Sequence, residues 1–138
     1  ILFGSDHQNY IGSSINNISL DTIEYSGEIN NAAFSKKCSF KDDKFFFEIS
    51  ILFIIKPLIE EIGFTNMPFY LAILNQDKEL IDTLYFSAKG DFKTDLETKK
   101  VVETEIIKTL SLKHESVNED FILVIGFVLD KKRKEILN

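Results

Sequence analysis

Apolar and polar residues alternate along most of this chain with a period of two, which is the pattern of half-buried β-strands. The clearest case is Phe45–Lys56, where every second residue is apolar. That face comprises Phe45, Phe47, Ile49, Ile51, Phe53 and Ile55. The opposite face is mixed, because it carries Glu48 and Ser50 beside apolar residues. We therefore expect this strand to bury its first face in the core and to cover its second face only in part.

Further strands are predicted wherever a weaker alternation lies between polar turns. These segments are Ile18–Ile29, Ala33–Phe40, Pro68–Leu74, Leu80–Phe86, Lys100–Leu112 and Glu119–Asp130. Short polar turns follow or join them at Lys41–Lys44, Asn75–Glu79 and Lys113–Asn118. If the strands run up and down, these turns share one end of the molecule. The longer connections Leu58–Met67 and Ser87–Lys99 then share the other end with the C-terminal tail.

About six to seven strands with regularly spaced turns predict an all-β protein, an antiparallel two-layer sandwich of the immunoglobulin-like or a related type. The expected domain spans residues 18–138. Residues 1–17 are rich in Gly, Ser and Asn, so we expect a flexible leader there. The composition of Lys131–Asn138 predicts a short C-terminal helical segment.

Composition excludes some functions. The chain has 138 residues, 16 basic and 22 acidic, and a net charge of −6, which argues against nucleic-acid binding. Cys38 is the single cysteine, so no disulfide forms within the chain. It is either a reactive thiol or, more commonly at such a position, a small buried hydrophobe. No apolar run reaches the roughly 18–20 residues that span a bilayer.

Catalytic chemistry is not indicated. His7 and His114 are the only histidines, and neither has an acid–base or metal-binding partner close in sequence. The carboxylate pairs Asp42-Asp43 and Glu119-Asp120 lie in turns, where a weak calcium site is conceivable but ordinary turn chemistry is more common. We therefore expect no enzyme activity, no cofactor and no metal site.

Three segments carry a resemblance to a known family. They are the Cys38-Ser39-Phe40 step before a tight acidic turn, the hairpin PFYLAILNQDKELIDTLYF and the final FILVIGFVLDKKRKEILN. Together they resemble an uncharacterised family of small exported lipoproteins of alphaproteobacteria, over about residues 23–138. The matching positions are Phe40, Pro68, Phe69, Tyr70, Ala72, Asp77, Phe86, Val124, Gly126, Phe127, Leu129, Leu137 and Asn138. Two departures are Val128, where the family has Gln, and a hairpin turn without Gly.

The resemblance implies a location more than an activity. It implies an exported, periplasmic protein with a lipid anchor on a cysteine upstream of Ile1. The matched residues are of a structural type, so they indicate fold and compartment rather than chemistry.

Two groups of residues are candidate partner-binding surfaces. The first is Leu58, Ile59, Ile62 and Phe64, four large apolar residues in one connection. They either cap the open end of the core or form an exposed patch of the kind that marks interaction sites. The second is the basic run Lys131, Lys132, Arg133 and Lys134, which either touches an acidic partner or is the solvated face of a terminal helix.

The sequence therefore predicts a non-catalytic structural or interaction module of the bacterial cell envelope. Such a module would be an exported lipoprotein or an accessory subunit of a membrane complex, with a protein as its partner. The alternative is a periplasmic carrier of a small apolar ligand, held between the sheets or at the end with the longer connections.

Overall fold

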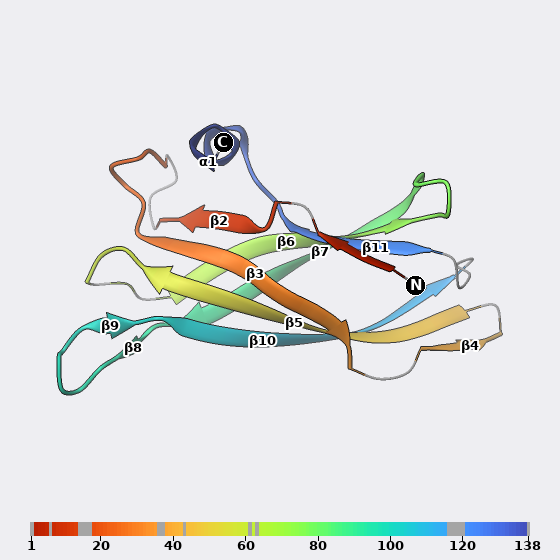
Figure 1. The fold of residues 1–138 in the computed structure, drawn as a ribbon, viewed down its shortest axis with the longest axis horizontal. Coiled ribbons are helices and arrows are strands. Elements are labelled where there is room, and N and C mark those ends of the chain that lie inside the picture. Colours follow the sequence, from red (N-terminus) through yellow and green to blue (C-terminus); the bar gives the residue numbers. More distant parts are fainter. Residues whose placement is uncertain are drawn as a thin grey trace.

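Two packed β-sheets make up the protein. The computed structural model describes residues 2–5, 7–13, 18–35, 38–42, 44–60, 62, 64–115 and 121–137. The first sheet has the strand order β1-β11-β6-β7. Its strands are β1 (Leu2–Ser5), β6 (Phe64–Leu74), β7 (Leu80–Asp91) and β11 (Ile122–Phe127). Figure 1 shows both sheets with their strands running along the long axis of the molecule.

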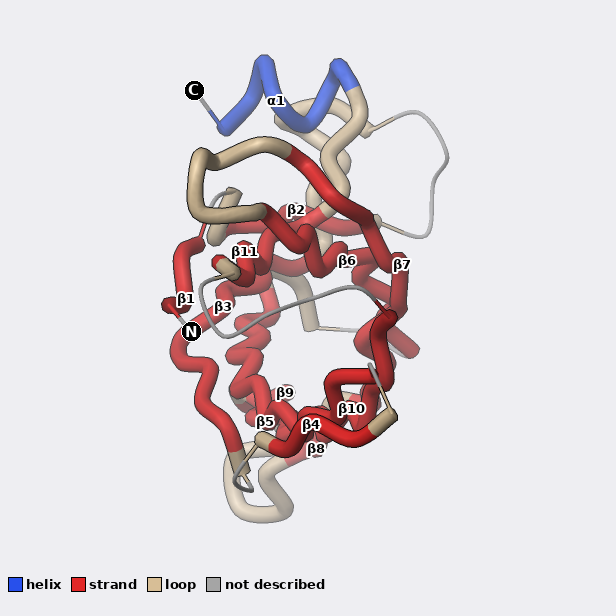
Figure 2. The backbone as a smooth tube through the Cα atoms, turned by 90° about the vertical axis from the view of Figure 1, so that its right-hand side faces the viewer, coloured by secondary structure: helices blue, strands red, loops and turns tan. Residues whose placement is uncertain are grey.

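The second sheet has the order β10-β5-β3-β2, with β4 beside β5. Its strands are β2 (Asn9–Gly12), β3 (Tyr25–Phe34), β4 (Ser39–Lys41), β5 (Lys44–Pro57) and β10 (Thr104–Glu115). A separate small hairpin pairs β8 (Lys93–Thr94) with β9 (Val101–Val102). The view along the strands places β11, β6 and β7 in one layer and β5 and β10 in the other (Figure 2). The expected all-β sandwich is confirmed, with more strands than the alternation predicts.

The core lies between the two layers and is rich in phenylalanine. The alternating face of β5 is fully buried, as its pattern predicts, and β11 buries Phe127 opposite it. Phe53 of β5 lies 5.0 Å from Phe69 of β6 and 5.8 Å from Phe127, measured between ring centroids. Further along, Phe45 meets the ring of Phe121 edge-on at 4.6 Å. Each fully buried side chain of this size contributes roughly 1.5–3 kcal/mol, so this interface supplies much of the stability.

The N-terminal segment crosses from one sheet to the other. β1 pairs in parallel with β11, whereas β2 pairs antiparallel with β3 in the second sheet. Between them, the N–H of Phe127 donates to the carbonyl of His7 (3.0 Å), and the N–H of Ile29 donates to the carbonyl of Gln8 (2.9 Å). The stretch that composition marks as a flexible leader thus adds a strand to each sheet. Its Gly, Ser and Asn residues obscure the short apolar pair Tyr10-Ile11, which is buried in the core.

β6 begins at Phe64, so the connection before it is shorter than the expected Leu58–Met67. Pro68, the expected first residue of the strand, lies inside it. The carbonyl of Pro68 accepts a hydrogen bond from the N–H of Val128 (2.9 Å). Because the nitrogen and the carbonyl of one strand residue point to the same side, the ring nitrogen faces the end of β11 and not β7. The missing N–H therefore removes no hydrogen bond from the β6–β7 ladder.

The expected turns Lys41–Lys44 and Asn75–Glu79 share one end of the molecule (Figure 1). Of the expected turn Lys113–Asn118, residues 113–115 belong to β10 and residues 116–118 lie outside the described part of the chain. Figure 1 shows the β6–β7 and β4–β5 turns at one end of the molecule, and the β5–β6 connection and the β8–β9 hairpin at the other. The chain ends in α1 (Lys131–Leu137), the expected short helix. α1 lies on the outer side of the first sheet, above the end of β11 (Figure 2).

If the N-terminal segment is integral to the sandwich, Tyr10 is a core residue. We expect Tyr10→Ala to lower the free energy of unfolding by about 3 kcal/mol or more, since a buried aromatic ring is removed. Asn9→Ala, at an exposed neighbour in the same strand, should change it by less than about 0.5 kcal/mol. Denaturant unfolding measures both. Equal midpoints for Tyr10→Ala and the parent would show that the segment is not part of the folded core.

Candidate functional site

The apolar connection after β5 divides into exposed and packed residues. Leu58 is 57% exposed and Ile59 is 42% exposed. Ile62 instead packs against the core cluster. Phe64 is the first residue of β6, and its side chain lies outside the described part of the structure. Each of the two alternatives, capping the core and exposing a patch, therefore applies to part of the connection. Ile62 covers the core, while Leu58 and Ile59 remain on the surface.

The basic run also divides into two parts. Lys131, Lys132 and Lys134 are exposed on α1, as expected for solvated cations. Arg133 is different, because only 14% of its side chain is exposed. Its guanidinium contacts other residues of this chain, whereas the three lysines face solvent.

Arg133 attaches α1 to the sandwich. Its Nε donates to the backbone carbonyl of Ile11 (2.7 Å) in β2, and its Nη1 pairs with the carboxylate of Asp130. The guanidinium also lies over the ring of Tyr10, 4.8 Å from the centroid. These contacts combine a charge-assisted hydrogen bond with a cation–π interaction. They hold the helix in place and leave the three lysines facing outward.

Below Arg133, two tyrosines extend the aromatic core. The rings of Tyr10 and Tyr25 lie 6.4 Å apart, and the hydroxyl of Tyr25 donates to the carbonyl of Asn66 (3.3 Å). Burial raises the pKa of Tyr25 to about 12, with a smaller contribution from neighbouring Tyr10. Burial also raises the pKa of Tyr10. Both phenols therefore stay neutral at physiological pH, and the hydroxyl of Tyr25 links β3 to β6.

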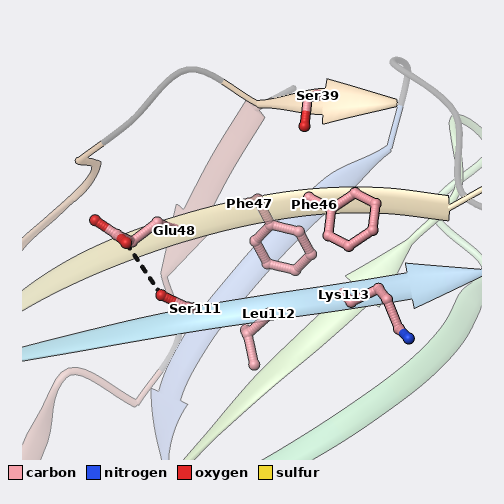
Figure 3. A pocket seen from close by; sticks show the side chains of 7 residues that line it. All are labelled: Ser39, Phe46, Phe47, Glu48, Ser111, Leu112 and Lys113. Atoms are coloured by element: carbon pink, nitrogen blue, oxygen red, sulfur yellow. Dashed lines mark hydrogen bonds between the residues drawn. The ribbon is translucent and has the colours of Figure 1, made fainter. Parts of the chain in front are cut away.

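A shallow hollow of about 350 Å³ lies where β4, β5 and β10 meet (Figure 3). Figure 3 shows Phe46, Phe47 and Leu112 along it, with Glu48 at one side and Lys113 near the other. Glu48 is already engaged, because its two carboxylate oxygens accept hydrogen bonds from Ser35 (2.7 Å) and Ser111 (3.0 Å). These hydroxyl-to-carboxylate hydrogen bonds link β5 to β10 and to the residue that follows β3.

His114 lies in β10, not in the turn where the sequence pattern placed it. Its Nε2 lies 2.9 Å from Oδ2 of Asp82 in β7, and 16% of its side chain is exposed. Its Nδ1 is buried without a hydrogen-bond partner. The pair joins the edge strands of the two sheets, so the carboxylate partner of His114 comes from a distant part of the sequence. Sequence could not show this contact, because 32 residues separate the two side chains.

Among the described residues, the other candidates from the sequence do not gather into one site. Cys38 packs against the core, and burial raises the pKa of its thiol, which disfavours the reactive thiolate. His7 is exposed and has a positive φ of 47°. Asp42 has a positive φ of 54°, as suits a turn residue, whereas Asp43, Glu119 and Asp120 lie outside the described residues.

The described residues contain no group of three or more His, Cys, Asp or Glu residues placed to hold a metal ion. Their single helix is too short to cross a bilayer.

The outer face of the first sheet carries surface residues that sequence reasoning did not select. Leu80, Tyr85 and Val128 are exposed there, beside Tyr70. The signal was present in the sequence, since the predicted hairpin has more apolar residues than one inward face requires. Comparisons with protein-family models, with curated proteins and with solved structures find no match to this chain.

The role of Arg133 is testable by stability. We expect Arg133→Gln to lower the free energy of unfolding by about 1–3 kcal/mol, because the carbonyl of Ile11 and the ring of Tyr10 lose their partner. Lys132→Gln removes the same charge from the same helix but should cost less than about 0.5 kcal/mol. Denaturant unfolding compares the two variants. Similar losses in both would indicate a general charge effect and not a specific attachment.

The raised pKa of Tyr25 predicts a loss of stability in alkali. The unfolded tyrosine ionises near pH 10, whereas the folded one holds its proton to about pH 12. The contribution of Tyr25 to the free energy of unfolding is constant below about pH 10. It falls as the pH rises through this window, by up to about 1.4 kcal/mol per pH unit. We expect unfolding measured at several pH values to show a shallower decline in Tyr25→Phe. Identical slopes in the two proteins would contradict this assignment.

Proposed function

We propose that the protein is a non-catalytic interaction module of a bacterial cell envelope, which docks to a protein partner. The observation that supports it is a set of large apolar side chains on separate connections at one end. Leu20, before β3, is 75% exposed, and Leu96, in the β8–β9 hairpin, is 92% exposed. With Leu58 and Ile59 they occupy three connections that Figure 1 places at the same end.

Such residues are informative as a group. A single exposed leucine is ordinary on a protein surface, whereas several at one end favour a contact surface. The turn at the opposite end of the first sheet, Asn75–Glu79, is polar by comparison. Connections also tolerate apolar residues only at a solvation cost, which partner binding would offset. We name Leu20, Leu58, Ile59 and Leu96 the apolar end.

The envelope location in this proposal rests on the family resemblance. An exported protein with a lipid anchor upstream of Ile1, serving as an accessory subunit of a membrane complex, fits a sandwich whose contacts are on its outside. Lys131 and Lys132 would add contacts to acidic groups of the partner. The carrier alternative with a ligand between the sheets gains less support, since phenylalanine rings fill that space among the described residues.

The test is partner recovery from native membranes. We expect the untagged protein, purified in mild detergent, to migrate with one assembly in fixed stoichiometry. Leu58→Ser combined with Leu96→Ser should dissociate it, because each leucine fully buried in a contact contributes roughly 1.5–3 kcal/mol. Mass spectrometry identifies the partner, and intact mass also tests for an acylated N-terminus.

Ile107→Ser is the matched control, because Ile107 is 72% exposed on the outer face of the second sheet. This variant should retain the partner. Recovery of the leucine variants in the same assembly, with unchanged folding, would remove the apolar end from the proposal. Recovery of the wild-type protein alone would count against the accessory-subunit role.

A further inference from the structure

A groove lies on the outer face of the first sheet, away from the apolar end. Its larger part has a volume of about 360 Å³ and lies over β6, β7 and the end of β11. Apolar and aromatic side chains line it, among them Tyr70, Leu80, Tyr85 and Val128. This volume is at the lower end of the range of small-molecule sites, roughly 300–1,000 Å³.

A β-bulge brings these residues to one face. Ile73 pairs with Asp82, but the next residue, Leu74, pairs with Leu80, so β7 holds one extra residue there. Strict alternation would place Leu80 inward, on the opposite face from Tyr85. The bulge shifts Leu80 to the outer face, the same face as the cross-strand pairs Tyr70–Tyr85 and Ala72–Thr83. Two aromatic rings and a leucine therefore border the same hollow.

A smaller hollow of about 210 Å³ continues the groove beneath α1. The two hollows share His7, Leu129 and Lys134. Lys134 thus lies where the apolar part ends, on a helix that Arg133 fixes to β2. A cation on an attached helix holds a defined position relative to the sheet.

The charge of the groove differs from the charge of the chain. The protein has 22 acidic and 16 basic residues, yet no carboxylate is among the described residues that line either hollow. Lys134 is the lysine among the described residues that line both hollows, and Thr83 adds a hydroxyl to the larger one. An apolar floor with a cation at one end complements a molecule with a flat apolar body and one anionic end.

We propose that this groove binds a small aromatic monocarboxylate, with its ring against Tyr70, Leu80 and Tyr85 and its carboxylate at Lys134. The site is separate from the apolar end and does not depend on the proposed partner. The ligand is held outside the sheets, so the packed core stays unchanged on binding.

The probe is 3-phenylpropanoate, with its neutral amide as the comparison. We expect titration followed by backbone NMR to shift Ala72, Thr83 and Val128 and to give millimolar affinity, as suits a ligand of about eleven heavy atoms. The amide should bind about tenfold more weakly, because it loses the charge-assisted contact with Lys134. Shifts confined to Ser111 and Leu112, in the other hollow, or no saturation in the millimolar range, would overturn the proposal.

Two matched lysine variants test which cation contacts the carboxylate of the ligand. Lys134→Gln should weaken binding of 3-phenylpropanoate about tenfold and abolish its advantage over the amide. Lys131→Gln removes an equal charge from α1 at a residue that does not line the groove, and it should leave the affinity unchanged. Leu80→Ser should weaken the binding of the acid and the binding of the amide to the same extent. Equal effects of the two lysine variants, or equal binding of acid and amide to the wild-type protein, would overturn the assignment of Lys134.

Discussion

The inward face of β5 is the constraint on which the rest of the structure depends. β3, β4 and β10 all pair with this strand, so its register sets the second sheet. Its Phe53 contacts Phe69 of the first sheet and its Phe45 contacts Phe121, the residue just before β11, so the same face also fixes how the layers pack. A slip by one residue would turn Glu48 and Lys56 inward and expose six apolar side chains. The alternation therefore selects a single pairing and a single packed face.

The sequence predicts those parts of the fold that follow from strict alternation. β5, β11 and most of β10 lie where the period of two indicates, because each has one buried face with few interruptions. β3 does not, since its register shifts between Ile29 and Asn31. Tyr25 and Ile29 lie inward before the shift, and Ala32 pairs with inward-facing Ile51 after it. The bulge moves the inward-facing apolar residues from odd-numbered to even-numbered positions. A prediction that assumes an unbroken period of two therefore divides this one strand into two.

The candidate surfaces were predictable only at the level of residue type. Apolar residues at Leu58, Ile59 and Ile62 are visible in the sequence, but which of them reach the core depends on how β6 approaches. Arg133 belongs to a basic run, and nothing nearby in the sequence indicates that Tyr10 and Ile11 are its partners. The pairing of His114 with Asp82 likewise depends on two edge strands meeting at a corner. Such contacts join residues that are distant in sequence, which local patterns cannot indicate.

The packing of the interior determines where a partner or a ligand can bind to this protein. Gly27 illustrates how close the layers are, because a Cβ built there would lie 2.3 Å from Sδ of Met67 in the other sheet. Space for a partner or a ligand is therefore found on the outside, where connections, bulges and the terminal helix depart from regular strands. The groove depends on the core all the same. Tyr10 supports Arg133, Arg133 fixes α1, and α1 places Lys134 at the end of an apolar sheet face. The N-terminal segment thus helps to set the position of Lys134 at the end of a groove that lies over β6 and β7.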